Sequence, residues 1–302
     1  MNGTWLVTGS GGLLGQDVLT GLREAGETAT GLDHKALDIT DAHAVREVMA
    51  KHRPAIVVNC AAFAAPDKAE NDEEGALRIN GGGARILATA CAEFEARLIH
   101  VSTDYVFAGD DSGGIAVPFA EDAPTRPVNA YGRTKVAGER AVLECLPETG
   151  YVFRTAWLFG AGRTNFVRTM IRLERERDQV EVVADQCGQP TWTVDAADQL
   201  IRLGRAALDG RAPAGAYHGS AGGQASWYEL AQEVFRLLGA DPERVRPSTG
   251  AAFGRPAPRP AYSVLGHARW QAVGIEPIRH WRAGLEAAFP SLVRAEDAAL
   301  PA

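Results

Sequence analysis

The sequence predicts an α/β protein built on a doubly wound parallel sheet, followed by a smaller C-terminal α/β lobe. The first half alternates short apolar runs with amphipathic stretches, which is typical of a parallel sheet covered by helices on both faces. A glycine-rich turn joins the first apolar run to the first amphipathic stretch. After Trp157 the alternation becomes irregular, which indicates a second lobe. We therefore expect a sheet domain over residues 1–160, a smaller lobe with chain crossovers over 161–292, and a frayed tail over 293–302.

The apolar pattern also bounds the individual elements. Strands are expected at 5–9, 28–33, 55–61, 97–103 and 151–157, with helices at 13–25, 41–52, 70–93 and 130–145. In the lobe we expect helices at 165–177, 194–207 and 226–238, a strand at 180–184 and an extended, proline-rich segment at 255–262. The Gly-, Pro- and Asp-rich stretch 108–127 should form a loop above the carboxyl ends of the strands, where ligands bind in such sheets.

The composition is that of a globular enzyme. Hydrophobic residues make up 46% of the 302 residues and charged residues 23%. The formal charge of -7 is spread along the chain without a basic cluster, so we expect no nucleic-acid partner. The N-terminus reaches a glycine turn too soon for a signal peptide, and no apolar run approaches transmembrane length. We expect a cytoplasmic protein without a membrane partner, and we expect its scattered cysteines (Cys60, Cys91, Cys145 and Cys187) to be free, mostly buried thiols.

A nucleotide site is predicted at the first turn. Gly9, Gly12 and Gly15 follow a strand and open a helix, in the spacing of a Rossmann-type dinucleotide-binding domain. The first glycine permits the tight turn, the second lets backbone amides approach a pyrophosphate, and the third allows close helix-strand packing. Asp33 ends the next strand, where its carboxylate can accept hydrogen bonds from the adenosine ribose.

The choice between NADH and NADPH stays open. Asp33 alone favours NADH because a carboxylate repels a 2′-phosphate. His34 and Lys35 follow it and could compensate for the phosphate, or they could form a solvated turn. Asp38 and Ile39 are further candidates for contact with the adenine.

Tyr131 and Lys135 are candidates for acid catalysis. They are four residues apart in a predicted helix and therefore share a face. We expect the Lys135 ammonium to lower the phenol pKa toward the range that is useful for proton transfer. Thr103 ends the fourth strand, where its hydroxyl could polarise a substrate carbonyl. The hydride would come from the cofactor, because no side chain can supply one.

The simpler alternatives are a surface Tyr-Lys pair and a threonine that only ends a strand. His100 is interpreted as a packed strand histidine without a role. The acidic residues Asp67, Glu70, Asp72, Glu73 and Glu74 are interpreted as a solvated helix start, and no metal site is expected.

Several longer motifs are more specific than the glycine turn. They read Asp67-Lys68-Ala69-Glu70, Ser102-Thr103-Asp104-Tyr105-Val106-Phe107, Tyr131-Gly132-Arg133-Thr134-Lys135, Arg154-Thr155-Ala156-Trp157 and Asp185-Gln186-Cys187-Gly188-Gln189-Pro190-Thr191. With them the chain resembles the dTDP-4-dehydrorhamnose reductase family, which belongs to the extended short-chain dehydrogenase/reductases. The resemblance runs from Trp5 to about Trp281.

The resemblance implies a set of site residues. The implied catalytic residues are Thr103, Tyr131 and Lys135. The implied cofactor positions, together with the glycine turn, are Gly9, Gly12, Leu13, Leu14, Gly15, Asp33, Asp38, Ile39, Ala62, Phe63, Ala64, Tyr131 and Lys135. The implied sugar-nucleotide residues are Thr103, Asp104, Trp157 and Arg259. Arg259 would meet the diphosphate, or it could be a loop arginine packed on prolines.

Two departures from the family pattern stand out. After the third strand, Phe63 and Ala64 replace residues that usually carry a polar tip and a hydroxyl, so a changed substrate is plausible. Some relatives dimerise through a magnesium site that uses a glutamate shortly after the Pro-Thr pair. The corresponding stretch here is Trp192-Thr193-Val194, so we do not expect that metal, and a homodimer stays open.

The resemblance implies NADPH- or NADH-dependent reduction of the C4 ketone of a dTDP-4-keto-6-deoxyhexose, first of all dTDP-4-dehydrorhamnose to dTDP-L-rhamnose. One alternative is a 4-ketoreductase for an antibiotic deoxysugar or a streptose-type sugar nucleotide. A remote alternative is a non-catalytic regulatory subunit with the same fold, like the partner of methionine adenosyltransferase.

Overall fold

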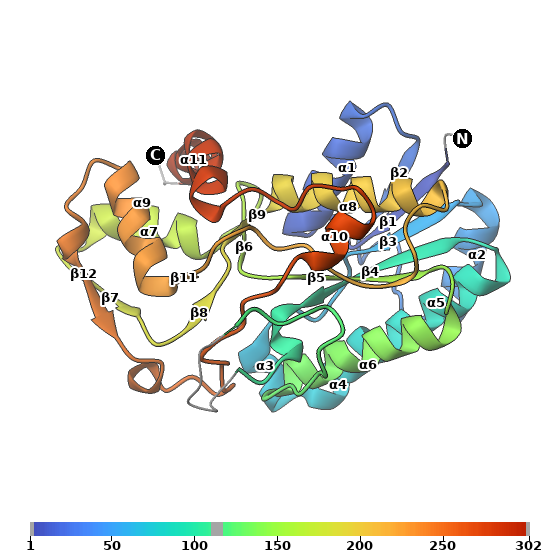
Figure 1. Cartoon of the computed structure of the whole chain (residues 1–302), viewed down its shortest axis with the longest axis horizontal. Coiled ribbons are helices and arrows are strands. Elements are labelled where there is room, and N and C mark those ends of the chain that lie inside the picture. The colour runs from blue at the N-terminus through green and yellow to red at the C-terminus, as the bar shows by residue number, and fades with distance from the viewer. Residues whose placement is uncertain (1–2, 110–116, 300–302) are drawn as a thin grey trace.

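The computed structural model describes residues 3–109 and 117–299. Within this part of the chain, a six-stranded parallel sheet has the order β10-β5-β4-β3-β1-β2 (Figure 1). The strands are β1 (Trp5–Thr8), β2 (Ala29–Leu32), β3 (Ile56–Asn59), β4 (Arg97–Thr103), β5 (Gly150–Thr155) and β10 (Gly215–His218). The predicted doubly wound α/β fold is confirmed.

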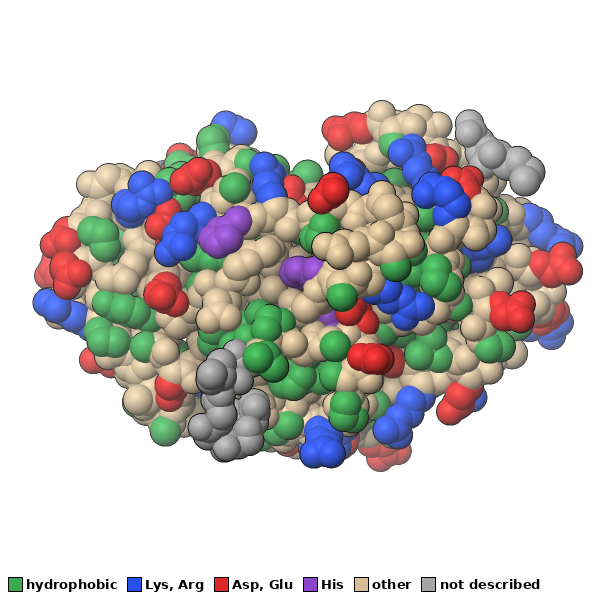
Figure 2. All heavy atoms as spheres, in the orientation of Figure 1, with side chains coloured by type: hydrophobic (Ala, Val, Ile, Leu, Met, Phe, Trp, Pro, Cys, Tyr) green, Lys and Arg blue, Asp and Glu red, His purple; other side chains and the backbone are tan. Residues whose placement is uncertain are grey.

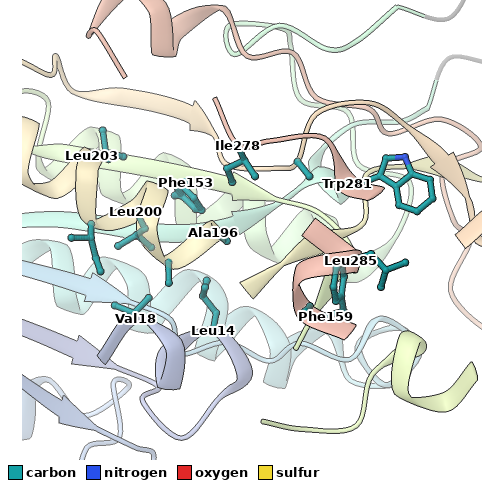
Figure 3. Packing of buried hydrophobic residues seen from close by; sticks show 14 of the residues in the cluster. Leu14, Val18, Phe153, Phe159, Ala196, Leu200, Leu203, Ile278, Trp281 and Leu285 are labelled. Carbon is teal, nitrogen blue, oxygen red and sulfur yellow. The ribbon is translucent and has the colours of Figure 1, made fainter. Parts of the chain in front are cut away.

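Helices cover both faces of this sheet. On one face lie α1 (Leu13–Glu24) and α8 (Thr193–Leu208), and on the other lie α2 (Ala42–His52), α5 (Ala84–Glu93) and α6 (Ala130–Cys145) (Figure 1). Successive strand residues point to opposite faces, so Trp5 and Val7 pack with α1 and α8 while Leu6 packs with α2 and α5. Figure 3 shows the first of these cores, where Leu14 and Val18 of α1 lie against Leu200 of α8.

The order of the strands reverses between β1 and β3. Gly9 follows β1 there with a φ of 65°, a conformation that favours glycine. A β-carbon on Gly9 would lie 2.5 Å from the backbone nitrogen of Ala61, just after β3. The turn therefore needs glycine for its backbone conformation and also for the close approach of the next strand. A crevice at such a reversal is where doubly wound sheets bind their ligands.

The single helix predicted over 70–93 is wrong. The structure has α3 (Pro66–Asn71), α4 (Glu73–Leu77), the π-helical turn η1 (Arg78–Gly83) and then α5. Asp72 leaves the helical conformation with a φ of -145°, and its carboxylate accepts a hydrogen bond from the amide of Gly75 at the start of α4. The side chain therefore ends one helix and caps the next.

A smaller lobe lies beside the sheet (Figure 1). Its helices are α7 (Phe166–Glu176) and α9 (Trp227–Leu237), and its strand β7 (Val180–Val183) pairs in parallel with β12 (Val245–Ser248). The chain returns from this lobe to the sheet through α8 and β10. The division at residue 160 stays a prediction. The remaining elements are η2 (Asp104–Val106), β6 (Leu158–Phe159), β8 (Cys187–Gly188), β9 (Thr191–Trp192), β11 (Ala225–Ser226), η3 (Pro242–Arg244), η4 (Ala251–Phe253), α10 (Ala268–Ala272) and α11 (Trp281–Asp297).

The expectation of a frayed tail from residue 293 is wrong as far as Asp297, because α11 continues to that residue. Glu296 is only 6% exposed, and its carboxylate lies 2.9 Å from the guanidinium of Arg168 on α7. This buried ion pair fastens the last turn of α11 to the lobe. Residues 300–302, and residues 110–116 of the predicted loop, lie outside the described part of the chain.

Acidic and basic side chains are interspersed over the face shown in Figure 2. Over the described residues, no helix combines the length and the apolar character needed to cross a membrane. The cysteines are unpaired within the described chain, as expected, but only Cys91 is fully buried.

Candidate active site

Tyr131 and Lys135 lie on the first turns of α6 and line the same cavity of about 650 Å³. Asn129 fixes the start of this helix, because its side chain accepts a hydrogen bond from the amide of Gly132. Thr103, at the end of β4, lines the cavity from the neighbouring strand. The structure thus brings together the three residues predicted to be catalytic.

The start of α1 lines the same cavity. Gly12, Leu13, Leu14 and Gly15 line it. Within the described chain no side chain caps α1, and its first turn carries no acidic residue. The first amides of the helix are therefore available to an anion, and the helix dipole favours one there. These features fit the pyrophosphate of a dinucleotide.

The three residues predicted after β3 differ in their positions. Ala62 and Ala64 line the cavity, whereas the side chain of Phe63 packs against a small buried cluster of Ala69, Ala76 and Ala130, against which Tyr131 also packs. Asn80, in the π-helical turn, accepts a hydrogen bond from the amide of Phe63 at 2.8 Å and donates one to its carbonyl oxygen at 3.2 Å. Asn80 thereby fixes the loop that carries these residues.

The predicted adenosine contacts follow β2. The Asp33 carboxylate accepts hydrogen bonds from the amides of Lys35 and Ala36, each at 3.0 Å. These bonds, and most of all the one from Ala36, hold the pKa of Asp33 below its usual value. Asp38 accepts from the amide and hydroxyl of Thr40, which lower its pKa in the same way. Both carboxylates are therefore charged at neutral pH. The side chain of Ile39 is buried in the core and is in neither cavity lining.

Lys135 is 1% exposed, and burial lowers its pKa to about 8, although Glu139 acts in the opposite direction. Its Nζ donates a hydrogen bond to the carbonyl oxygen of Val101 at 2.7 Å and lies 3.3 Å from Nε2 of His100. The amine is thus held against β4, beneath the cavity that it lines.

Burial raises the pKa of the Tyr131 phenol, and the Asp104 carboxylate raises it further, while a hydrogen bond with the Thr103 hydroxyl lowers it. The predicted lowering of this pKa by Lys135 is therefore wrong for this structure. Its physical reason is desolvation, which disfavours the phenolate more than the neighbouring groups favour it. The phenol keeps its proton throughout the neutral range, as a general acid must before it donates.

Asp104 is fully buried beside Thr103. Its carboxylate accepts hydrogen bonds from the hydroxyl of Ser263 at 2.6 Å and from that of Thr103 at 3.0 Å. Burial raises its pKa to about 6, and the two hydroxyls act in the opposite direction. Asp104 therefore orients the Thr103 hydroxyl, whose oxygen also accepts a hydrogen bond from the amide of Tyr105 at 3.2 Å.

Another cavity, of about 890 Å³, continues from the first one toward the smaller lobe. The two cavities share Pro66, Tyr105, Phe166 and Trp227 in their linings. Trp157, in the left-handed conformation with a φ of 45°, stacks on Trp227 with the ring centroids 3.6 Å apart. This aromatic stack lies on the cavity wall where the two spaces meet.

Arg259 lines the larger cavity and has a strong partner. Its guanidinium donates to both carboxylate oxygens of Asp67, at 2.6 and 2.8 Å, across 192 residues of sequence. The interpretation of the acidic run as a solvated helix start is wrong for Asp67. It holds for Asp72, which is exposed and caps the start of α4.

Two further residues of this run also have partners. Glu70 accepts a hydrogen bond from the amide of Ala130 at the start of α6, and Glu73 forms a two-bond ion pair with Arg133 on the same helix. The acidic run thus holds α3 and α4 against the helix that carries Tyr131.

With this geometry in view, comparisons with known proteins identify the family. A model described as the RmlD substrate binding domain matches residues 3–293. The chain belongs to this family. It is 58% identical to the dTDP-4-dehydrorhamnose reductase of Streptomyces griseus, covering 95% of this chain and 93% of that protein. It is 50% identical to the dTDP-4-keto-6-deoxy-D-glucose reductase of Streptomyces niveus, covering 97% of this chain and 98% of that protein.

A solved structure agrees with this assignment. The dTDP-4-dehydrorhamnose reductase of Bacillus anthracis in complex with NADP superimposes with a TM-score of 0.89 at 36% identity, covering 96% of this chain and 99% of that one. The RmlD family resemblance that the motifs indicate is thereby confirmed.

Sequence reasoning missed several residues of this family member's site. Trp227, Phe166, Ser263 and Asn80 each contact or line it. Trp227 follows the helix cap Ser226, and Phe166 follows the helix cap Asn165. An aromatic residue directly after a helix cap in the smaller lobe is the sequence pattern that could have indicated both residues. Ser263 and Asn80 carry no local signal, because their partners lie far away in the sequence.

Proposed function

We propose that the protein reduces the C4 ketone of a dTDP-4-keto-6-deoxyhexose with NADPH or NADH, and that its first substrate is dTDP-4-dehydrorhamnose, giving dTDP-L-rhamnose. The observation that carries this proposal is the convergence of Tyr131, Lys135 and Thr103 on the cavity that the open start of α1 also lines. A bound reduced nicotinamide would supply the hydride that the ketone carbon needs. Tyr131 donates its proton to the ketone oxygen, so that an alcohol forms.

The remaining residues are assigned to binding. The amides at the start of α1 would hold the cofactor's pyrophosphate, and Asp33 its adenosine ribose. Lys135 would hold the nicotinamide ribose next to Tyr131. In this structure the Thr103 hydroxyl donates its single proton to Asp104. To polarise the ketone oxygen, the hydroxyl would turn and donate that proton to the ketone, which would also align the ketone with the phenol. The other cofactor positions predicted from the sequence keep the roles proposed there.

The larger cavity is proposed for the nucleotide part of the substrate. Its volume of about 890 Å³ is within the range of pockets that enclose a small-molecule ligand. Trp157 lies at its junction with the smaller cavity and is assigned to the sugar, and Arg259 is assigned to the diphosphate. Asp67 already engages both terminal nitrogens of that guanidinium, so the diphosphate would have to share Arg259 with it.

A different 4-keto-6-deoxyhexose is the second candidate substrate. The relative in Streptomyces niveus is named for dTDP-4-keto-6-deoxy-D-glucose, and Phe63, which packs against the same apolar cluster as Tyr131, carries no polar group. Purified protein would be given dTDP-4-dehydrorhamnose and, separately, its C3 and C5 epimers, while NADPH oxidation is followed. Turnover of an epimer without turnover of dTDP-4-dehydrorhamnose would move the assignment to that sugar.

Tyr131→Phe tests the mechanism. Loss of the proton donor should lower kcat by about 10²–10⁴-fold, because general acid catalysis contributes an effect of that order. The dissociation constant for NADPH should change little. Tyr105→Phe is the matched control, since Tyr105 lies edge-on to Tyr131 and lines the same cavity. It should retain most of the turnover. The proposal fails if the two variants lose activity equally, or if Tyr131→Phe keeps it.

A non-catalytic regulatory subunit is a weaker candidate, because such a role gives no reason for the proton donor to face the cavity. We propose a cytoplasmic location, which agrees with four unpaired cysteines. Light scattering with and without Mg²⁺ tests the assembly. A dimer that forms only with Mg²⁺ would contradict our inference that the stretch around Thr193 binds no metal.

A further inference from the structure

His100 is a buried titratable residue that the proposed reaction does not use. It lies in the middle of β4, is 0% exposed and forms part of a hydrogen-bonded chain across the sheet. Its Nδ1 lies 2.9 Å from Nδ2 of Asn59 on β3, and its Nε2 lies 3.3 Å from Nζ of Lys135. The chain therefore ends at the amine that is proposed to hold the nicotinamide ribose.

The polarity of this chain follows from one backbone group. The amide of Ala61 can only donate, and it lies 3.1 Å from Oδ1 of Asn59, which also accepts from the hydroxyl of Thr8 at 2.7 Å. The other end of the Asn59 amide must then be its NH₂ group, which donates to Nδ1 of His100. Because Nδ1 accepts, a neutral imidazole must carry its proton on Nε2.

His100 is neutral in this environment. Burial lowers its pKa well below the usual value, and the charge of Lys135 lowers it further. The Nε2–H therefore points at Nζ of Lys135. An ammonium has only hydrogens to offer and cannot accept this bond, whereas a neutral amine has a lone pair that can.

The other groups around Lys135 do not replace this interaction. Glu139, on the same helix, is engaged by two bonds from Arg154 and one from Ser102. The Cys60 thiol, which follows β3, stays neutral because burial raises its pKa to about 12. Tyr131, one turn earlier on α6, also stays neutral.

We propose that the Ala61 amide and Asn59 fix the Nε2–H tautomer of His100, and that His100, acting as a positioning residue, donates to Lys135 and favours its neutral amine. Lys135 then loses its charge at a lower pH than an exposed lysine does. This inference rests on the proposed function only for its consequence in catalysis. The tautomer itself can be tested without turnover.

The first experiment is ¹⁵N NMR of protein labelled in histidine, with the His100 signals assigned by their loss in His100→Gln. We expect a protonated Nε2 and an unprotonated, hydrogen-bonded Nδ1 from pH 6 to pH 9. A proton on Nδ1 would overturn the proposal, whatever the enzyme's activity.

The second experiment reverses the direction of the hydrogen bonds that run from Asn59 through His100 to Lys135. In Asn59→Asp both carboxylate oxygens accept, so Nδ1 of His100 must donate and Nε2 must accept from a Lys135 ammonium. The alkaline limb of kcat/KM, which we assign to Lys135 because the phenol pKa is higher, should move upward by about one pH unit. His100→Gln should shift it in the same direction, since its amide can rotate to present an oxygen.

His218→Gln is the matched control. His218 is also a buried strand histidine with a pKa lowered to about 3 by burial, but it contacts Arg154 and Gly266. The alkaline limb of kcat/KM for His218→Gln should stay at the pH found for the wild type. A folded, active Asn59→Asp variant with an unmoved limb would overturn the proposal. Absence of turnover in the wild type, with the expected NMR tautomer, would refute the proposed function and leave the tautomer in place.

Discussion

The protonation of the site depends on burial more than on its charged neighbours. Tyr131 has a raised pKa and Lys135 a lowered one, so both neutral forms are favoured. A sequence shows that the two residues share a helix face, but it does not show how deeply that face is covered. The four-residue spacing of Tyr131 and Lys135 was therefore enough to identify the pair. The expected direction of the phenol pKa was wrong because it depends on burial.

Asp104 should make the protein less stable as the pH rises. Its pKa of about 6 lies above the ~3.9 of an unfolded aspartate, so the folded state binds more protons in that window. The free energy of unfolding should therefore fall by about 2 kcal/mol from pH 4 to pH 6 on account of this group. Urea unfolding of wild type and Asp104→Asn at several pH values would measure it. Parallel pH profiles for the two proteins would contradict the expectation.

Helix α6, which carries Tyr131 and Lys135, is held in position by the elements around it. Its bounds were predicted correctly from the apolar pattern, because Asn129 gives a clear start and the pattern is regular up to Cys145. The helix predicted over 70–93 was wrong because Asp72 can serve both as a helical residue and as a cap. The sixth strand, β10, was not predicted, because Gly215–His218 carries little apolar signal.

The β1–α1 turn should tolerate no side chain at Gly9. Gly9→Ala combines a positive φ with a contact of 2.5 Å to the Ala61 backbone. Gly26→Ala is the control, because it has a φ of 73° and open space around it. We expect Gly26→Ala to cost about 1 kcal/mol and Gly9→Ala at least ~2 kcal/mol, with loss of NADPH binding. Chemical denaturation and cofactor titration measure both. Equal costs would show that the close approach to β3 does not matter.

Long-range pairs connect the sheet to the smaller lobe, and they are what the sequence did not reveal. The ion pair of Asp67 and Arg259 joins α3 to the proline-rich segment. The motifs named both residues but did not indicate that they form a pair. Ser263 reaches Asp104 across 159 residues. The motifs found the residues at strand and helix ends, where chemistry leaves a local pattern. Their supporting partners depend on tertiary packing.

The Arg168–Glu296 pair should contribute strongly to the stability of the whole chain. Both side chains are less than one-tenth exposed, so Glu296→Gln leaves a buried guanidinium without its counter-charge. We expect a loss of about 3 kcal/mol in the free energy of unfolding. Glu176→Gln removes the exposed partner of Arg172 and should cost less than ~0.5 kcal/mol. A similar small loss in both variants would show that the end of α11 is not fastened by this pair.

The stack of Trp157 on Trp227 gives the protein an optical reporter of its own. The two indole rings have their centroids 3.6 Å apart and their planes within 4°, and they lie where the two cavities meet. A molecule that displaces either ring changes the intrinsic fluorescence. Occupancy of the site can therefore be followed by light, without a dye and without waiting for a reaction to occur.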